Sequence, residues 1–236
     1  MTDWLHLPSP LIIGHRGASA DAPENSLAAF ALAQEQGAHG IELDVMLSAD
    51  GIPVVIHDDT LDRTTAATGP VAARTAAELE ALDVPTLDDV FLTFGPSLLY
   101  NVELKLYSLR DRGLEAAVAD RIAAYHLESR VLISSFHPAC VRRARRHLTR
   151  TTPIALLHHT RWLRAAHHWL ALEAIHPDYK LVDDAYMAWA RAHGYQVNVW
   201  TVDDPVAAQR MVDLGVHAII TNRPRYLREQ LKLDER

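Results

Sequence analysis

The stretch LIIGHRGASADAPENSLAAFALAQEQGAHGIELDVML, residues 11–47, contains one complete strand–helix–strand unit. The apolar runs at its two ends indicate buried strands, because Val, Ile and Leu follow one another there with few polar interruptions. The residues between them have helical composition, with Asn25 as the expected N-cap and Gly37 as the stop. Two strands joined through a helix are typical of an α/β protein with a parallel sheet.

The same unit recurs along the rest of the chain. We expect eight strands, beginning near Leu11, Gly40, Leu98, Val131, Pro153, Ala174, Gln196 and Ala218. From the fourth strand onward the starts recur about every 22 residues, which is enough for one strand and one helix. Eight such units predict a (β/α)8 TIM barrel. The alternative is an open doubly wound sheet, but the chain has no Gly-x-Gly-x-x-Gly turn.

The connection between the second and third strands is the irregular one. It contains the turn signal Ala49-Asp50-Gly51 and a further apolar run, PVVIHD, at residues 53–58. We therefore predict a small insertion at residues 47–85, above the mouth of the barrel. No low-complexity linker divides the chain, so we expect one domain over residues 1–236.

Composition excludes several classes of function. The net charge of -7 argues against a general nucleic-acid binder, and the basic run at residues 142–147 is expected to be a solvated helix face. The single cysteine, Cys140, fits a reducing compartment, so we expect a cytoplasmic protein. No apolar run is long enough to span a membrane, and the N-terminal stretch does not resemble a signal peptide. Stable membrane insertion is therefore not expected.

In a barrel of this kind the functional site forms where the strands end and their loops begin. The polar residues that the pattern places there are His15, Arg16, Glu42, Asp44, His57, Asp58, Asn101, Glu103 and Lys105. The sequence therefore predicts a site rich in both carboxylates and cations at one end of the barrel.

Two of these carboxylates, Glu42 and Asp44, alternate along one strand and so point to the same face. Two like charges on an apolar strand are costly unless a cation compensates them, and Glu103 on the next strand could supply a third ligand. Three carboxylate ligands favour one hard divalent cation, Mg²⁺ or Ca²⁺, over Zn²⁺. The alternative is a set of salt bridges to Arg16 and Lys105.

Two histidines, His15 and His57, also follow apolar runs at positions where a site is expected. The simpler interpretation, in a chain of fourteen histidines, is a pair of surface or packed residues. Combined with a cation and with Arg16 and Lys105, however, two imidazoles suit the cleavage of an anionic ester such as a phosphodiester. One imidazole takes a proton from the nucleophile and the other protonates the departing alkoxide. Other anionic substrates remain open at this point.

The residues lie in sequence blocks that resemble those of the glycerophosphodiester phosphodiesterase family. In order, the blocks are HRGASADAPENSLAAF, GIELDVMLSADGIPVVIHDDTLDRTT, NVELK, ISSF, NVWTVD and AIITNRP, over about residues 11–225. The resemblance implies a barrel with an insertion after the second strand. It also implies an enzyme that hydrolyses glycerophosphodiesters, as small-molecule substrates, to glycerol 3-phosphate and an alcohol.

The resemblance also implies roles for the polar residues at the strand ends. His15 and His57 would be the acid/base pair. The carboxylates of Glu42, Asp44 and Glu103 would bind the divalent cation.

Further residues would contact the substrate. The resemblance implies that Arg16 holds phosphate, that Lys105 lies beside it, and that Glu24 and Asn25 line the first loop near the metal or substrate. From their places at strand ends, Phe136 could contact the alcohol and Trp200 could form a wall of the pocket. Rim packing for Phe136 and core packing for Trp200 are the alternatives.

One departure from the family pattern affects the expected substrate. The stretch AELEALDVPTLDDV, residues 77–90, leads from a helix directly into the PTL block without the usual Gly- and Trp-containing segment. The insertion is thus trimmed, and a more open pocket is expected. Two alternatives follow: an enzyme that acts on lysophospholipids or another glycerol phosphodiester, and a barrel that binds phosphorylated ligands without turning them over.

Overall fold

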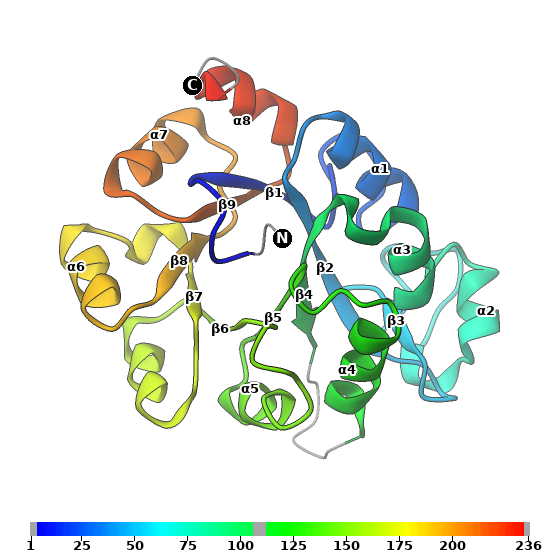
Figure 1. Ribbon diagram of the computed structural model, residues 1–236. Helices are drawn as coiled ribbons and strands as arrows, with labels where there is room; N and C mark the ends of the chain where they lie inside the picture. Colours follow the sequence, from blue (N-terminus) through cyan, green and yellow to red (C-terminus); the bar gives the residue numbers. More distant parts are fainter. Residues whose placement is uncertain (1–3, 106–111, 234–236) are drawn as a thin grey trace.

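Eight parallel strands close into a barrel in the computed structural model of the protein, which describes residues 4–105 and 112–233 (Figure 1). The strands are β1 (Leu11–His15), β2 (Gly40–Leu47), β4 (Leu99–Leu104), β5 (Val131–Ser135), β6 (Ile154–His158), β7 (Ala174–Pro177), β8 (Gln196–Val199) and β9 (Ala218–Thr221). Because β1 pairs with both β2 and β9, the sheet has no open edge between them. The predicted (β/α)8 barrel is confirmed, and the open sheet is wrong.

Helices surround the barrel and separate successive strands (Figure 1). They are α1 (Leu27–Glu35), α3 (Leu87–Phe94), α4 (Leu114–Ala124), α5 (Pro138–Ala144), α6 (Asp184–Ala192), α7 (Pro205–Leu214) and α8 (Pro224–Gln230), with the 3₁₀ segments η2 (Gly95–Ser97), η3 (Arg161–Trp169) and η4 (Tyr179–Leu181). Helix α7 has an acidic start and a glycine end: Asp204 accepts a hydrogen bond from the Ala207 N–H, and Gly215 is left-handed. Within residues 4–105 and 112–233, no helix has both the length and the apolar character of a membrane span.

The N-cap of α1 is Ser26, and the prediction of Asn25 was wrong. The Ser26 hydroxyl accepts a hydrogen bond from the Ala29 N–H, as a helix cap should. Asn25 is instead left-handed, with φ of 56°, and its side chain donates to Asp44 on β2. The Asn25 amide therefore donates to the buried Asp44 carboxylate and does not cap α1, which is the role that the local sequence pattern predicts.

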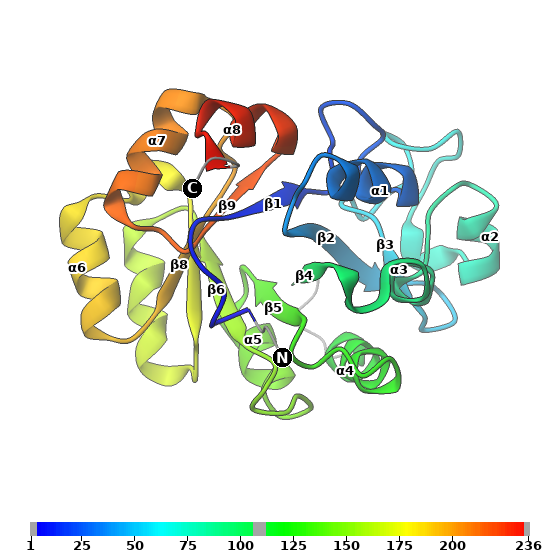
Figure 2. The ribbon, with the colours of Figure 1, turned by 45° about the horizontal axis from the view of Figure 1, so that its top comes forward.

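The segment between β2 and α3 forms a small unit beside the barrel (Figure 2). It contains β3 (Pro53–Val55), which pairs antiparallel with β2, then η1 (Val71–Ala73) and α2 (Ala76–Glu80). Apolar side chains of this unit form a buried cluster with Met46 of β2: Val54, Ile56, Leu61, Val71, Ala76, Leu79 and Val84. The unit lies within the range predicted for the insertion and brings the end of β3 to the carboxyl ends of β1 and β2.

Apolar side chains from the beginnings of the strands fill the barrel at the end opposite the polar residues. Leu11, Leu99 and Ala218 belong to this layer, and Trp4 packs against it. The Trp4 indole donates to the carbonyl of Arg130 at 2.7 Å. The apolar layer closes this end, so the polar strand ends face the opposite mouth, as is usual for this fold.

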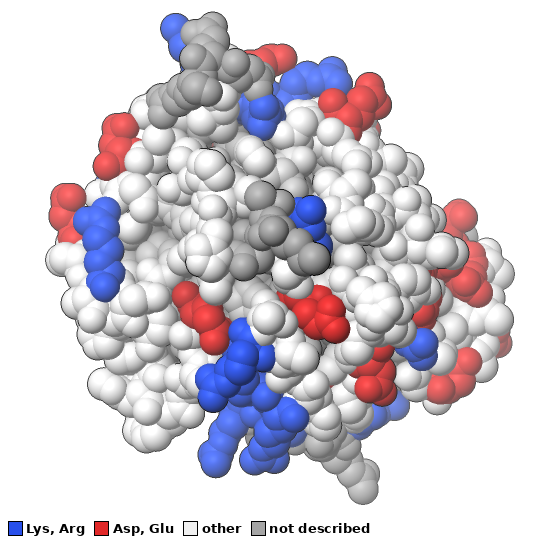
Figure 3. Space-filling view, in the orientation of Figure 1, with Lys and Arg blue, Asp and Glu red and all other residues white. Residues whose placement is uncertain are grey.

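Basic side chains gather in Figure 3 over the region of α5. Two arginines of this region lie in ion pairs, Arg143 with Glu115 at 2.7 Å and Arg145 with Glu173 at 2.5 Å. The carboxylates thus neutralise part of the charge that a nucleic acid would need. The absence of a nucleic-acid partner stays a prediction.

Candidate active site

The register of three neighbouring strands places three carboxylates together. His15 of β1 lies opposite Glu42 of β2, and Asp44 of β2 lies opposite Glu103 of β4. Oxygen atoms from Glu42, Asp44 and Glu103 lie within 4.8 Å of one another, and all three side chains are buried. Strand alternation points Glu42 and Asp44 the same way, so the convergence follows directly from the parallel pairing.

Two cationic side chains contact this carboxylate cluster. The Lys105 Nζ lies 2.9 Å from Asp44 Oδ1 and 2.6 Å from Glu103 Oε1. The Arg16 Nε lies 3.1 Å from Asp44 Oδ2, and the Arg16 backbone N–H donates to Glu42 Oε2. The salt bridges considered from the sequence are therefore present. Two cations nonetheless leave one of the three negative charges uncompensated.

The pKa values of the cluster reflect this imbalance. Burial, together with the charges of its acidic neighbours, raises the pKa of Glu42 well above its usual range. The same causes, burial first and then Asp44, raise the pKa of Glu103 to about 7. Burial would also raise the pKa of Asp44, but Lys105 and Arg16 outweigh it and lower that pKa to about 2.

Such a donor set fits a divalent cation. Burial and the neighbouring carboxylates oppose the ionisation of Glu42 and Glu103, and a cation would offset both effects. Only carboxylate oxygens converge there, and hard oxygen donors suit Mg²⁺ or Ca²⁺. Glu42, Asp44 and Glu103 are the residues that would hold the ion. No other group of three His, Cys, Asp or Glu side chains within the described part of the chain has this geometry.

His15 lies at the end of β1 and is held by a residue that the sequence analysis missed. Its Nδ1 lies 2.7 Å from Asn222 Oδ1, just beyond β9, while its Nε2 lies 3.9 Å from Glu42 Oε2. Burial, and then the charge of Arg16, lowers the pKa of His15. The neutral imidazole is therefore favoured. Nothing in the local sequence marks Asn222 as a partner of His15, which lies 207 positions away.

His57 comes from the loop after β3, the strand that pairs with the last residues of β2. Its Nδ1 lies 2.6 Å from Asp58 Oδ1, and Asp58 Oδ2 accepts a hydrogen bond from Arg63. Arg63 also donates two hydrogen bonds to Glu24. Arg63 thus ties the insertion to the first loop, a role the sequence analysis did not identify although the residue lies in a quoted block.

The first loop supports the cluster through Glu24 and Asn25. Glu24 accepts a hydrogen bond from Arg16 at 2.9 Å, and Asn25 donates to Asp44 Oδ2 at 2.8 Å. The loop is compact because Gly17 is left-handed and packs on α1, where a Cβ would lie 2.6 Å from the Ala29 backbone. Both predicted loop residues therefore lie beside the cluster, where they orient Arg16 and Asp44.

A cavity of about 190 Å³ opens at the mouth of the barrel. Its lining brings together most of the predicted site residues: His15, Arg16, Glu42, His57, Asn101, Glu103, Lys105, Phe136, Leu157, Trp200, Thr201 and Ile220. The rings of Phe136 and Trp200 meet edge to face, 5.4 Å apart, and form one wall. Asp44 is absent from this lining because Arg16 and Lys105 lie against it.

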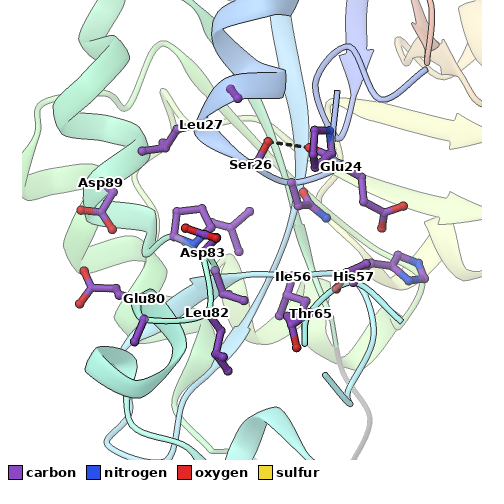
Figure 4. A pocket seen from close by; sticks show the side chains of 18 of the residues that line it. Glu24, Ser26, Leu27, Ile56, His57, Thr65, Glu80, Leu82, Asp83 and Asp89 are labelled. Atoms are coloured by element: carbon purple, nitrogen blue, oxygen red, sulfur yellow. Dashed lines mark hydrogen bonds between the residues drawn. The ribbon is translucent and has the colours of Figure 1, made fainter. Parts of the chain in front are cut away.

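A second, wider groove of about 800 Å³ lies between the first loop and the insertion (Figure 4). Glu24, Asn25 and His57 line it, so predicted site residues are divided between the groove and the cavity, and His57 lines both. Figure 4 shows Leu27 and Leu82 on its walls. None of the described residues that line it is Lys or Arg. The small cavity thus has a larger neighbour that carries apolar side chains on its walls.

Comparison with known proteins agrees with this geometry. The family model described as "Glycerophosphoryl diester phosphodiesterase family" matches residues 15–226. A curated relative, "Glycerophosphodiester phosphodiesterase" from Caldanaerobacter subterraneus subsp. tengcongensis, is 37% identical over 233 residues, which are 92% of this chain and 96% of the relative. The match to the family model therefore includes every predicted site residue, from His15 to Trp200.

Two solved structures resemble the chain over nearly its whole length. A phosphodiesterase from Oleispira antarctica, in complex with the product sn-glycerol-3-phosphate, is 29% identical with a TM-score of 0.81 and covers 94% of this chain and 97% of its own. Glycerophosphodiester phosphodiesterase from Agrobacterium tumefaciens is 28% identical with a TM-score of 0.79 and covers 93% and 99%. The chain therefore belongs to the glycerophosphoryl diester phosphodiesterase family.

Proposed function

We propose that the protein hydrolyses glycerophosphodiesters to glycerol 3-phosphate and an alcohol, with one divalent cation, Mg²⁺ or Ca²⁺, held by Glu42, Asp44 and Glu103. The observation that carries the proposal is a cluster of three buried carboxylates beside one small cavity, which two of them and two histidines line. The Oleispira antarctica relative, which was solved with glycerol 3-phosphate as product, supports this class of substrate.

Arg16 and Lys105 would bind the phosphate. Both line the cavity, and both contact Asp44, a predicted ligand of the cation. The bound ion would neutralise a phosphoryl oxygen and help to acidify the attacking hydroxyl. With that charge in place, the guanidinium of Arg16 can fork onto two phosphate oxygens, and Lys105 can act as a second point charge.

His15 and His57 would transfer the protons. They come from β1 and from the loop after β3, and both line the cavity. One imidazole takes the proton of the attacking hydroxyl and the other gives a proton to the departing alkoxide, so the P–O bond breaks without forming a free alkoxide. We propose that the neighbouring glycerol hydroxyl attacks first. Water then opens the resulting cyclic phosphate, with the proton transfers reversed.

An assay of glycerophosphocholine tests the proposed function. We expect turnover when Mg²⁺ or Ca²⁺ is present and a loss of at least about 100-fold after EDTA treatment, since the cation supplies charge that no described side chain replaces. Adding the metal back should restore the rate. Activity that persists unchanged in EDTA would refute the metal-dependent mechanism. If no glycerophosphodiester were turned over, the protein would be a barrel that binds phosphorylated ligands without hydrolysing them.

The wider groove favours a second candidate substrate class, lysophospholipids or another large glycerol phosphodiester. It has room for a group much larger than glycerol, it has apolar walls at Leu27, Ile56 and Leu82, and it adjoins His57. Assays of glycerophosphocholine and lysophosphatidylcholine side by side separate the two classes. A strong preference for the unacylated diester would exclude the second.

The cellular setting follows from the same proposal. The products would feed glycerol and lipid metabolism, and the substrate is a small molecule. Cys140 is buried, as a structural thiol usually is, and a cytoplasmic location stays a prediction.

A further inference from the structure

A chain of hydrogen bonds runs from the loop after β8 to His15. Asp203 Oδ2 accepts a hydrogen bond from Asn222 Nδ2 at 2.6 Å, and Asn222 Oδ1 lies 2.7 Å from His15 Nδ1. Asp203 and Asn222 follow neighbouring strands, β8 and β9, and β9 pairs with β1, which carries His15. The closed barrel therefore aligns these three side chains on consecutive strand ends.

The carboxylate of Asp203 fixes which way the Asn222 amide faces. Asp203 Oδ1 accepts hydrogen bonds from the Thr221 hydroxyl and the Asn222 backbone N–H, both at 2.8 Å. An ionised carboxylate can only accept hydrogen bonds, so the group that faces Asp203 Oδ2 must be the amide NH₂ of Asn222. The Asn222 carbonyl oxygen is then left to face His15.

An acceptor at this position decides the tautomer of His15. The carbonyl oxygen of Asn222 cannot donate, so His15 Nδ1 must carry the proton. The Ser19 hydroxyl lies 2.7 Å from both Asn222 Oδ1 and the His15 carbonyl, and donation to either acceptor leaves this assignment unchanged. The lone pair then belongs to His15 Nε2, the nitrogen nearer Glu42 in the cavity.

We infer that Asp203 and Asn222 are positioning residues that hold His15 in the Nδ1–H tautomer, with Nε2 ready to accept the proton of the attacking hydroxyl. The inference rests on the proposed function and goes beyond it by giving His15 the accepting role. The partner behind the ring differs at His57, where Nδ1 faces the carboxylate of Asp58 and not a neutral amide.

The substitution Asp203→Asn reverses the direction of the hydrogen bonds from residue 203 to His15 without changing the size of the side chain. The two donors on the Oδ1 side would hold the carbonyl oxygen of the new amide, so its NH₂ would face Asn222. Asn222 must then flip, present its own NH₂ to His15 Nδ1, and force the proton onto Nε2. We expect kcat to fall by about 100-fold or more with KM nearly unchanged, as when a histidine is held in the wrong tautomer.

Nitrogen-15 NMR of the ¹⁵N-histidine-labelled protein, in buffer containing Mg²⁺, reads the tautomer directly. The chain has fourteen histidines, and the resonances missing from His15→Gln identify those of His15. At a pH where His15 is neutral, we expect Nδ1–H in the wild type and Nε2–H in Asp203→Asn. Asp204→Asn is the matched control, because asparagine also caps a helix well and Asp204 caps α7 outside this chain of bonds.

Two results would overturn the inference. The first is an Nε2–H tautomer of His15 in the wild type, which decides the matter even if Asp203→Asn does not fold. The second is an unchanged Nδ1–H tautomer in folded Asp203→Asn, or in Asn222→Ala, for which we expect both tautomers. These spectra need no substrate, so they judge the positioning role independently of whether the wild-type protein turns over glycerophosphodiesters.

Discussion

Replacing His57 with glutamine is expected to lower kcat by about 10²- to 10⁴-fold, the usual contribution of general acid–base catalysis. Glutamine keeps a polar side chain at the cavity but cannot release or take up a proton near neutral pH. The proposed leaving group is an alkoxide, so the loss should appear in kcat, while Arg16 and Lys105 keep KM within a few-fold of the wild type. Steady-state kinetics on glycerophosphocholine measure both constants.

His15→Gln should show a loss of similar size. Because both histidines would act in the same displacement, the double variant should lose little more than either single variant. His147→Gln is the control, since His147 is exposed at the end of the α5 region, outside both pockets. If either single variant of the site kept more than a tenth of the wild-type kcat, that histidine would have no role in proton transfer.

Asp44→Asn is expected to weaken Mg²⁺ or Ca²⁺ binding by at least about 100-fold. This loss of affinity is larger than the one expected when a residue that only orients a metal ligand is replaced. Asp44 is the member of the cluster whose pKa is depressed, to about 2, so it is ionised before a cation arrives. Its isosteric amide removes this charge and leaves Lys105 and Arg16 with one partner fewer. Turnover at moderate metal concentration should fall in parallel.

Isothermal titration of the EDTA-treated protein with each cation measures the affinity, and circular dichroism confirms that the variant is folded. Asp213→Asn is the matched control because Asp213 is exposed on α7 and contacts Gln209 only through a surface hydrogen bond. Equal cation affinity in Asp44→Asn and the wild type would mean that the carboxylate cluster is held by its salt bridges and is not a metal site.

The fold could be predicted from the sequence because the same pattern, an apolar strand followed by a helix, recurs along the chain. Each strand is a short apolar run and each is followed by a helix, so an error at one element does not alter the architecture. Predicted and observed starts differ by one residue only at β4, expected from Leu98, and at β6, expected from Pro153. Once the strands are parallel and in order, the residues at their carboxyl ends must share one mouth.

Residues that act through long-range partners could not be predicted in the same way. Asn25 looks like a helix cap, and only the buried Asp44 explains why its side chain turns inward. Asn222 acquires a role from His15 and Asp203, which approach it only when the barrel closes. Arg63 likewise depends on Glu24 of another loop. Local patterns carry no information about such partners.

The central claim is that one divalent cation binds among Glu42, Asp44 and Glu103 within reach of both histidines. A crystal structure with Ca²⁺ and glycerol 3-phosphate tests it most directly. We predict Ca²⁺ at about 2.3–2.6 Å from an oxygen of each carboxylate. The phosphate should contact the ion, with His15 Nε2 and His57 each at about 2.6–3.2 Å from a substrate oxygen or a bridging water. A cation bound elsewhere, or a phosphate beyond the reach of both imidazoles, would contradict the account.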